Sequence, residues 1–554
     1  MKERTLKIAI GFLLALASFI VHAQTETDNA RMFLFTDRDY CISGDTLWFK
    51  VFLKSGLTEQ GDVIHVQLDS PDNNLISTVI RQSRNQWAEG YIFVPDSLST
   101  GVYFLTAFLN SQRNNPGLEA LSKSLFVYNR FANEITDMKI PTGRQKVVPG
   151  KAGGVQLEIN KNEFAPREKV TVAVDCSELN QQGIKNVVVK ATKIDELAEE
   201  AGGTFKVNPR PFNPEIPFLD ESDGFILNGK VTDPETGAPK AGALVLLSIV
   251  REPPYFDYSY TGKDGGFYFF LKNAEGTTNV ILQAIPEKDE EYKISLGKNY
   301  LVRRSNFTME PKKLTPNQTD FISNQVSGSF FRRLFKNSYV VKPDSFYMPP
   351  RFSIPFYGKP NNHIVTAEFI DLPNFQEISR ELLPGVQYRE KDGEITFRLL
   401  NETQSVYFNV EPLRLINGIP VFKNSFFASL KSTDIDYIDV VLKQRLFGDL
   451  LFNGILAVSL KDKSNLWLAQ QANIFQFSVK CLQPAKSPAY NQEPDFRETI
   501  PDIRQVYLWK SMNTATPETF GFYLSDLKGK VEVSVEGVNK NNENVKFSKI
   551  IEVK

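Results

Sequence analysis

Residues 32–35 read MFLF, and they lead directly into TDRDYCISGDTLWFKVFL at residues 36–53. Ser43-Gly44-Asp45 is a turn signal between two apolar runs, which is the pattern of a β-hairpin. Clusters of Pro, Asn, Ser and Gly separate further short apolar runs at 62–68, 75–80, 91–94, 102–109 and 122–128. Strands at this spacing, without a helical period, predict a β-sandwich over residues 30–131.

The composition indicates a multidomain globular chain. At roughly 100–200 residues per domain, 554 residues predict three to five domains. The 42% hydrophobic and 23% charged content excludes a disordered or coiled-coil protein, and 43 Phe with 19 Tyr favour strands. The net charge of −1 gives no field to hold nucleic acid or anionic lipid.

Residues 1–23 have the features of a secretory signal peptide. Lys2, Arg4 and Lys7 precede an apolar stretch that ends in a small-residue cleavage pattern at Ala23. An uncleaved anchor is the alternative interpretation. No later stretch reaches the ~18 apolar residues of a spanning helix, so we expect a mature chain without a transmembrane span. We expect a protein of the periplasm or outer membrane, with the cell surface as a further possibility.

The three cysteines are too few and too far apart to form a disulfide framework. Cys41, Cys176 and Cys481 are interpreted as small hydrophobic residues of sandwich cores, and a free reactive thiol is the alternative.

The first predicted sandwich resembles the MG2-type macroglobulin-like domain of the alpha-2-macroglobulin superfamily. The resemblance is carried by Thr36-Asp37-Arg38, Gly44-Asp45-Thr46 and Trp48-Phe49, with Cys41 where that family usually has Tyr. Asp37 and Arg38 are interpreted as a structural pair at a strand corner, rather than as a ligand site. A shorter echo of the motif at 164–170 predicts a second macroglobulin-like sandwich over 138–200.

A Pro- and Asn-rich linker is predicted at 202–222, followed by a third sandwich at 223–305. FILNGKVTDPETGAPKAGALVLLSIV (225–250) and TGKDGGFYFFL (261–271) resemble the carboxypeptidase regulatory-like, transthyretin-like domain. The residues that carry this resemblance are Gly229, Val231, Asp233, Thr236, Gly237, Pro239, Asp264, Gly266 and Phe267. The resemblance implies a non-catalytic module.

Residues 311–465 are predicted to form an α+β domain. An amphipathic helix is expected at 314–335, with Thr315 as its N-cap, and a short helix at 375–382. The domain resembles the plug domain of TonB-dependent outer-membrane receptors, without the barrel that follows in such receptors. The matching residues are Pro412, Ile416, Asn417, Gly418, Pro420, Asp434, Ile435, Ile438, Gly448, Gly454 and Ile455. Residues 470–554 predict a C-terminal β-sandwich.

No catalytic, cofactor-binding or metal-binding residue is predicted, and no cofactor is expected. Outside residues 1–23 the chain has two histidines, His65 and His363, which are far apart in sequence and have no neighbouring Cys or His. None of the cysteines lies in a macroglobulin thioester motif. The acidic clusters at 287–291 and 220–223 are interpreted as a solvated loop tip and as the end of the linker, rather than as calcium sites.

Two aromatic and proline clusters are the candidate contact surfaces. Aromatic side chains anchor protein interfaces and stack on sugars, although local packing against the sandwiches is the favoured alternative. The candidate partner contacts are Tyr255, Phe256, Tyr258, Phe346, Tyr347, Phe356 and Tyr357.

Together, the order of domains resembles a family of exported Gram-negative proteins. Its fold class is mainly β and multidomain, with tandem β-sandwiches and an α+β plug-like domain. We expect a non-enzymatic, rod-like scaffold that docks to an outer-membrane β-barrel protein or transport complex. A surface-exposed adhesin or glycan-binding protein is the alternative, and an unrecognised hydrolase is the third interpretation.

Overall fold

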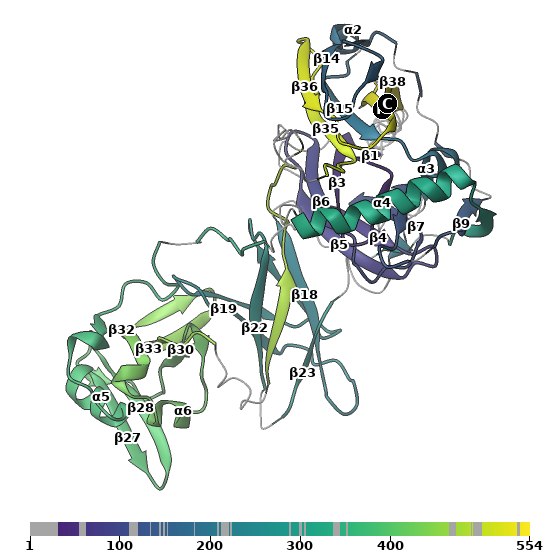
Figure 1. The fold of residues 1–554 in the computed structure, drawn as a ribbon. Coiled ribbons are helices and arrows are strands. Elements are labelled where there is room, and N and C mark those ends of the chain that lie inside the picture. The colour runs from purple at the N-terminus through teal and green to yellow at the C-terminus, as the bar shows by residue number, and fades with distance from the viewer. Residues whose placement is uncertain are drawn as a thin grey trace, which may run out of the picture. The chain divides into compact units, whose positions relative to one another are not determined.

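The computed structural model describes residues 31–54, 63–109, 120–132, 134–142, 146–147, 150–151, 153–181, 183–207, 210–211, 221, 224–286, 290–297, 302–303, 306–335, 344–350, 353–464, 473–488, 490, 501–539 and 543–554. The predicted signal peptide lies outside these residues. The structure is mainly β, as the sequence predicts. The chain forms two compact units: unit 1 comprises 1–223, 298–343 and 482–554, and unit 2 comprises 224–297 and 344–481 (Figure 1).

Unit 1 begins with a β-sandwich, called here the N-terminal sandwich. One sheet has the order β1 (Arg31–Thr36), β3 (Thr46–Lys54), β6 (Trp87–Phe93). The other has the order β10 (Lys146–Val147), β16 (Thr204–Val207), β8 (Ala120–Tyr128), β7 (Gly101–Leu109), β4 (Val63–Asp69), β5 (Leu75–Gln82), with β2 (Tyr40–Ile42) parallel to β8. Apolar side chains of both sheets, Leu47 and Val66 among them, form the core between them.

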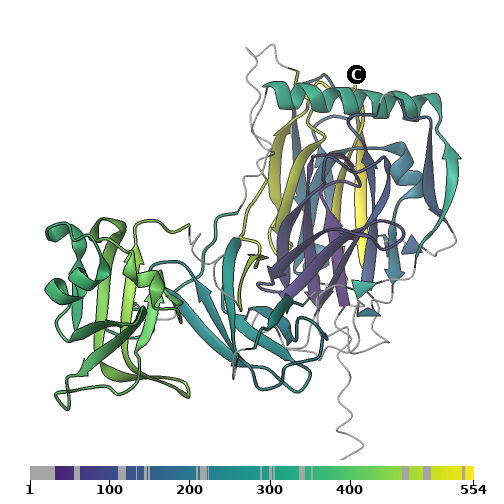
Figure 2. The same ribbon diagram turned by 90° about the horizontal axis from the view of Figure 1, so that it is seen from below.

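Helices and aromatic residues cover a second core in unit 1. Phe104 of β7 stacks on Phe307, with ring centroids 3.7 Å apart. Ile322 and Val326 of helix α4 (Pro316–Phe335) and Leu197 of helix α3 (Glu196–Ala201) are buried in the same cluster. Strand β25 (Thr308–Lys313), which leads into α4, pairs with β9 (Asp137–Thr142). Figure 2 shows α4 lying across one side of this unit.

The helix predicted at 314–335 therefore exists, but it belongs to unit 1 and not to the α+β domain in which the sequence placed it. The reason is its apolar face: buried Ile322 and Val326 cover aromatic residues of the N-terminal sandwich. Hydrophobic periodicity predicts that a helix has a buried face, but it does not say which surface buries it.

Unit 1 contains a second sandwich, called here the composite sandwich. One sheet has the order β11 (Gly150–Lys151), β38 (Asn544–Val553), β37 (Gly529–Val538), β15 (Asn186–Lys193), β35 (Val506–Asn513), and β13 (Glu163–Phe164) also pairs with β38. The other has the order β12 (Gln156–Ile159), β14 (Lys169–Asp175), β36 (Glu518–Tyr523). Helix α2 (Ser177–Gln181) follows β14, and the pair β17 (Arg210–Pro211) and β24 (Val302–Arg303) also lies in unit 1.

The prediction of separate sandwiches at 138–200 and 470–554 was wrong, because strands from both segments form this single domain. β14 pairs with β36, and β15 lies between β35 and β37. The shared core includes Val172 and Val189 from the first segment and Tyr507 and Val533 from the second. Such long-range pairings leave no local pattern in the sequence.

The predicted linker at 202–222 also needs correction in its first part; residues 208–209, 212–220 and 222 lie outside the described residues. Residues 204–207 form β16, which lies between β8 and β10, and its Phe205 and Val207 are buried. Phe205 and Val207 alternate with polar residues, and this alternation is the period of a β-strand. The segment therefore forms a strand although its surroundings are rich in Pro and Asn.

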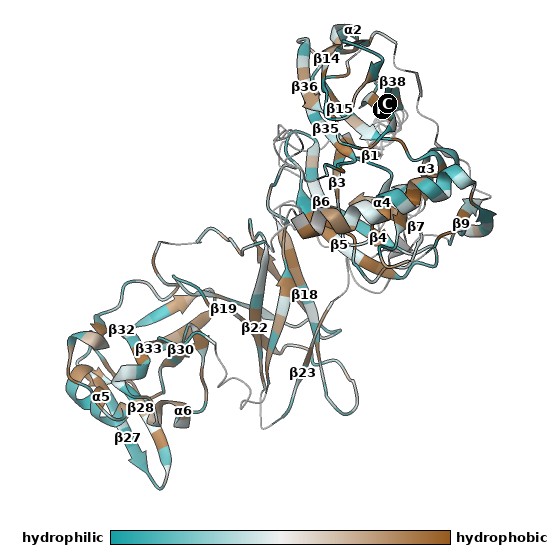
Figure 3. Ribbon diagram, viewed as in Figure 1, coloured by the Kyte–Doolittle hydropathy of each residue, from teal (hydrophilic) through white to brown (hydrophobic). Residues whose placement is uncertain are grey.

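Unit 2 contains a sandwich close to the predicted 223–305, called here the central sandwich. Its sheets have the orders β21 (Gly266–Leu271), β18 (Phe225–Thr232), β23 (Lys293–Leu296) and β20 (Tyr255–Tyr260), β19 (Leu244–Ile249), β22 (Thr277–Ile285), β34 (Ile474–Lys480). Figure 3 shows hydrophobic residues along β18 and β22. Strand β34 comes from the segment predicted to start the C-terminal domain, so this sandwich is completed from a distant part of the chain.

The α+β lobe of unit 2 follows the predicted arrangement. Its main sheet has the order β26 (Asn362–Val365), β32 (Ile435–Phe447), β33 (Leu450–Leu460), β30 (Leu413–Ile416), β31 (Ile419–Pro420), and a smaller one has the order β27 (Val386–Lys391), β28 (Glu394–Asn401), β29 (Val406–Tyr407). Helices α5 (Phe375–Leu382) and α6 (Ser425–Ala428) pack on them through buried Phe375 and Phe427. No helix within the described part of the chain has the length and apolar character that crossing a membrane requires.

Candidate functional site

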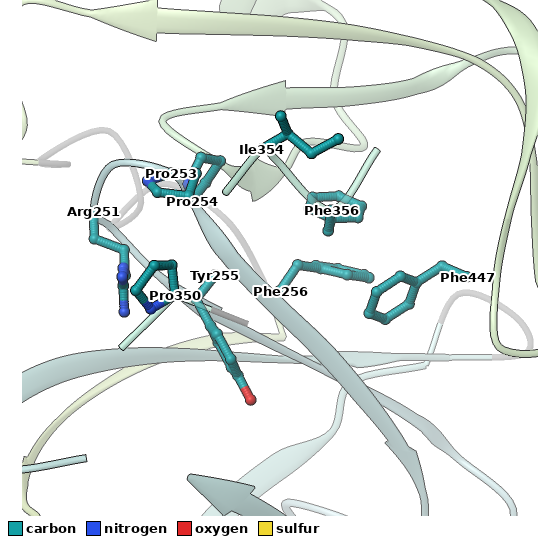
Figure 4. A pocket seen from close by; sticks show the side chains of 9 residues that line it. All are labelled: Arg251, Pro253, Pro254, Tyr255, Phe256, Pro350, Ile354, Phe356 and Phe447. Carbon is teal, nitrogen blue, oxygen red and sulfur yellow. The ribbon is translucent and has the colours of Figure 1, made fainter. Parts of the chain in front are cut away.

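An aromatic cluster joins the central sandwich to the α+β lobe within unit 2. The ring of Phe256, on β20, lies 4.4 Å from that of Phe356 in a stacked arrangement and 5.4 Å from that of Phe447, on β32. Figure 4 shows these three rings gathered beside Pro253 and Pro254. The small cavity that they line has a volume of about 20 Å³. Aromatic pairs at such separations contribute about 0.5–1.5 kcal/mol beyond the area that they bury. This cluster therefore stiffens the region in which the candidate contacts lie.

The seven candidate contact residues differ in their exposure to solvent. Tyr255, Phe256 and Tyr357 are buried, so they pack locally. Local packing is the favoured alternative to a role in partner contacts. Phe346, Phe356 and Tyr258 are partly exposed, and Tyr347 is 62% exposed. Only these last four remain available as contacts.

A larger cavity of about 230 Å³, called here the Arg251 cavity, lies in the same unit. It is lined by Val250, Arg251, Glu252, Pro254, Tyr357, Asn417, Gly418, Tyr437, Ala457, Val458, Ser459 and Lys463. These residues come from the segment after β19, from the segment before β26, from the turn between β30 and β31, and from β32, β33 and the residues after β33. The cavity thus depends on packing between elements that are distant in sequence.

Tyr437 and Glu252 form one polar wall of the cavity. The Tyr437 hydroxyl donates to both carboxylate oxygens of Glu252, at 2.8 and 3.1 Å. Burial, and then the hydrogen bond to Glu252, raise the pKa of Tyr437. The phenol therefore stays protonated at neutral pH and keeps the carboxylate engaged.

Tyr357, Asp439 and His363 form a second hydrogen-bonded group. Its hydroxyl donates to Asp439 Oδ2 at 2.8 Å, while His363 Nδ1 lies 2.6 Å from Asp439 Oδ1. Burial and the Asp439 charge raise the pKa of Tyr357. Asp439 is buried and serves both partners, so the group holds the Tyr357 ring in place against the cavity.

The turn at Asn417-Gly418 forms another part of the lining. Both residues have left-handed backbone angles, with φ of 53° and 79°, as a tight two-residue hairpin turn requires. Asn417 Oδ1 accepts from the Leu460 amide at 2.8 Å, and a Cβ added at Gly418 would lie 2.5 Å from Pro254 Cβ. The Asn-Gly pair that carried the plug-like resemblance therefore positions the turn against the central sandwich.

The Asp37–Arg38 motif is a buried charged cluster in unit 1. Arg38 donates to the Thr46 carbonyl at 3.0 Å and lies 3.4 Å from Asp45 Oδ2. Asp37 accepts from the Trp48 amide and from the Tyr490 hydroxyl. Burial raises the pKa of Asp37, and the Arg38 charge opposes that rise. The contacts are those of a structural corner, as the sequence indicated.

Of the acidic cluster at 220–223, Glu221 is the residue that the structure describes, and it is more than the end of a linker. Glu221 is buried and its Oε2 lies 2.7 Å from His65 Nε2, in unit 1. In the other cluster, Glu290 pairs with Lys240 at 3.0 Å, and residues 287–289 lie outside the described part. Among the described residues, no three His, Cys, Asp or Glu side chains gather in a group that could hold a metal ion.

The sequence did not single out Arg251, Glu252, Tyr437 or Lys463. Only the turn signals beside them, Pro253-Pro254 and Asn417-Gly418, mark the neighbourhood. The side chains converge through tertiary packing, which hydrophobic periodicity does not encode.

No protein-family model matches the chain, and no curated protein matches it. Among solved structures, it is similar to Escherichia coli alpha-2-macroglobulin activated by porcine elastase, at 10% identity and a TM-score of 0.23, over 95% of this chain and 44% of that one. It is also similar to Salmonella alpha-2-macroglobulin reacted with methylamine, at 10% identity and a TM-score of 0.23, over 95% of this chain and 39% of that one. A tetra-tandem repeat in the extending region of a large adhesion protein is similar at 8% identity and a TM-score of 0.14, over 95% of this chain and 99% of that one. The chain spans less than half the length of these macroglobulin chains, and TM-scores this low carry no argument about fold or function.

Proposed function

We propose that this chain is a non-enzymatic exported scaffold that docks to an outer-membrane β-barrel protein or envelope complex through unit 2. The resemblances of its sandwiches to macroglobulin-like and regulatory-like domains, and of its α+β lobe to a receptor plug, motivate this choice of partner. The observation that supports this role is a surface feature of unit 2.

That feature is the hairpin formed by β32 and β33. Leu446 and Leu451 are opposite each other in the register, and they are 73% and 51% exposed. The neighbouring Phe447 is held in the aromatic cluster with Phe256. An exposed apolar pair on an anchored hairpin loses little conformational entropy on binding, which favours a role as an interface anchor.

The test is an affinity pull-down from detergent-solubilised membranes of the native host, with the full mature chain as bait. We expect enrichment of an outer-membrane β-barrel protein, lost in the double variant Leu446→Asp with Leu451→Asp. The matched control is Val406→Asp, which changes another exposed residue of unit 2, on β29. Recovery of no β-barrel protein, or equal recovery with the double variant, would overturn the proposal.

A second candidate, an adhesin or glycan-binding protein, is favoured by one other observation. Tyr268 and Phe270 of β21 are exposed and form an edge-to-face pair with centroids 5.7 Å apart. Exposed aromatic rings stack on sugars. Proteolysis of intact cells separates the two functions, because only a surface adhesin would be cut.

A further inference from the structure

The turn between β32 and β33 is fixed against β20 of the central sandwich. Gly448 and Asp449 form this turn, and the Asp449 amide donates to the Tyr258 hydroxyl at 3.0 Å. Gly448 has a φ of 62°, and a Cβ added there would collide with the Tyr258 hydroxyl. The turn therefore lies directly on Tyr258, and the backbone that carries Asp449 is held in place.

Three aromatic rings lie beside this turn. The Tyr258 ring centroid lies 5.9 Å from that of Tyr260 and 5.9 Å from that of Phe447, and both pairs are edge-to-face. Tyr260 is 48% exposed, and Tyr258 and Phe447 are partly exposed. The negative face of a Tyr or Phe ring attracts a cation within about 6 Å of the ring centroid. The rings thus offer π surface to a positively charged group that approaches from solvent.

The carboxylate of Asp449 lies close to two of these rings. Its hydrogen bond to Tyr258 raises the pKa of that phenol, and burial and then the Asp449 charge raise the pKa of Tyr260. Both effects require the carboxylate to lie near the two hydroxyls. Asp449 is itself exposed, so solvent reaches its side chain. A negative charge and aromatic faces therefore occur together at one accessible place.

The charge of Asp449 is not balanced by a cation of the described residues. None of their Lys, Arg or His nitrogens lies within 4.0 Å of its carboxylate. The basic residues of the same strand have other partners: Lys443 pairs with Glu402 at 3.3 Å, and Arg445 donates to the Tyr357 carbonyl at 3.0 Å. Phenol hydroxyls are neutral donors, and a carboxylate has about four lone-pair sites. Asp449 therefore retains both charge and acceptor capacity.

A guanidinium matches this combination better than a quaternary ammonium does. A guanidinium donates N–H groups to a carboxylate and stacks on an aromatic ring through the same planar group. A quaternary ammonium has no N–H, so it could use only the rings. The hairpin also exposes Leu446 and Leu451 on the two strands that flank the turn, which suits a side chain presented by an apolar protein surface.

We propose that Asp449, Tyr258 and Tyr260 form a binding site for an arginine side chain of the docking partner. The guanidinium donates to the Asp449 carboxylate and covers the Tyr260 ring, while Leu446 and Leu451 contact apolar surface around that arginine. The site rests on the proposed docking function, because it belongs to the same hairpin. A choline-type cation is the other occupant, which the test separates.

A ligand-observed NMR titration of the full mature chain tests the site with N-acetyl-arginine methylamide and N-acetyl-citrulline methylamide. Citrulline has a neutral ureido group of the same shape in place of the guanidinium. We expect the arginine probe to bind at least about fivefold more tightly, because exposed ion pairs and cation–π contacts are individually weak. Added NaCl should reduce this difference. Choline should bind more weakly than the arginine probe.

Variants then locate the contact. Asp449→Asn should lower the affinity of the arginine probe to that of the citrulline probe and leave the citrulline probe unchanged, and Tyr260→Leu should also weaken the arginine probe. Asp436→Asn removes another exposed carboxylate of β32 and is the matched control, which should change neither affinity. Equal affinity for the two probes, no binding of the arginine probe, tighter binding of choline, or an unchanged arginine affinity in a folded Asp449→Asn variant would overturn the proposal.

The probes need no partner protein, so this result is independent of the pull-down. If the arginine probe is preferred but no β-barrel protein is recovered, the docking function fails and the cation site stands. If a β-barrel protein is recovered and the two probes bind equally, only the cation site fails.

Discussion

Replacement of Glu536 by Gln tests whether a buried ion pair stabilises unit 1. Glu536, on β37, lies 2.8 Å from Lys190 Nζ, on β15, and both side chains are buried. Burial raises the pKa of Glu536, but the charges of Lys190, Lys546 and Lys123 outweigh that effect and lower the pKa from 4.5 to about 2. The fold therefore stabilises the carboxylate form.

The magnitude follows from the two pKa values. The interval from 4.5 to about 2, at about 1.36 kcal/mol per pH unit, corresponds to about 3 kcal/mol. Because the folded-state value is the lower one, this stabilisation is complete above pH 4.5 and is lost as pH falls through about 2. At pH 3, which lies between the two pKa values, somewhat less than half of it remains. Glu536→Gln should thus cost about 3 kcal/mol at pH 7 and somewhat less than half of that at pH 3.

Urea unfolding followed by tryptophan fluorescence measures the effect. Trp48, Trp87 and Trp509 belong to unit 1, and a Trp467→Phe background removes the fourth Trp, which belongs to unit 2. Glu518→Gln, an exposed change on β36 of the same sandwich, should change the free energy of unfolding by less than about 0.5 kcal/mol. A cost below about 1 kcal/mol for Glu536→Gln at pH 7, or the same cost at both pH values, would refute the reasoning.

Three further predictions concern packing. Phe256→Ala should destabilise unit 2 by about 3–5 kcal/mol, whereas Tyr347→Ala should cost under about 0.5 kcal/mol, as measured by hydrogen exchange; similar costs for both would contradict the buried and exposed positions. Gly418→Ala should destabilise more than Gly393→Ala in thermal unfolding, because both have a positive φ but only Gly418 would bring a Cβ against Pro254; equal shifts would exclude the clash. The three cysteines are buried, and burial raises the thiol pKa of Cys41 to about 12, of Cys176 to about 11 and of Cys481 to about 12. A thiol reagent at pH 8 should therefore label them slowly until denaturant is added, and rapid labelling of the native chain would contradict this.

Local patterns account for the parts of the fold that were predicted correctly. The strands around Gly44 and the helix at 375–382 follow from alternation, turn residues and the Asn374 cap, all of which act within a few residues. The burial of Cys41 beside Arg38 likewise fits its position inside a strand. The candidate contacts were found only in part, because Tyr255 and Tyr347 have equally aromatic surroundings in sequence but opposite exposure in the structure.

The amino-acid sequence by itself determined that this chain is a mainly β protein with a small α+β lobe, because strand and helix periods are written into neighbouring residues. The tertiary structure alone decided that β36 completes the sheet of β14, that α4 covers the N-terminal sandwich, and that Arg251 and Lys463 line one cavity. The physical reason is that a strand edge or an apolar face specifies only that it must be covered. Which distant segment covers it depends on shape and register, and these exist only once the chain has folded.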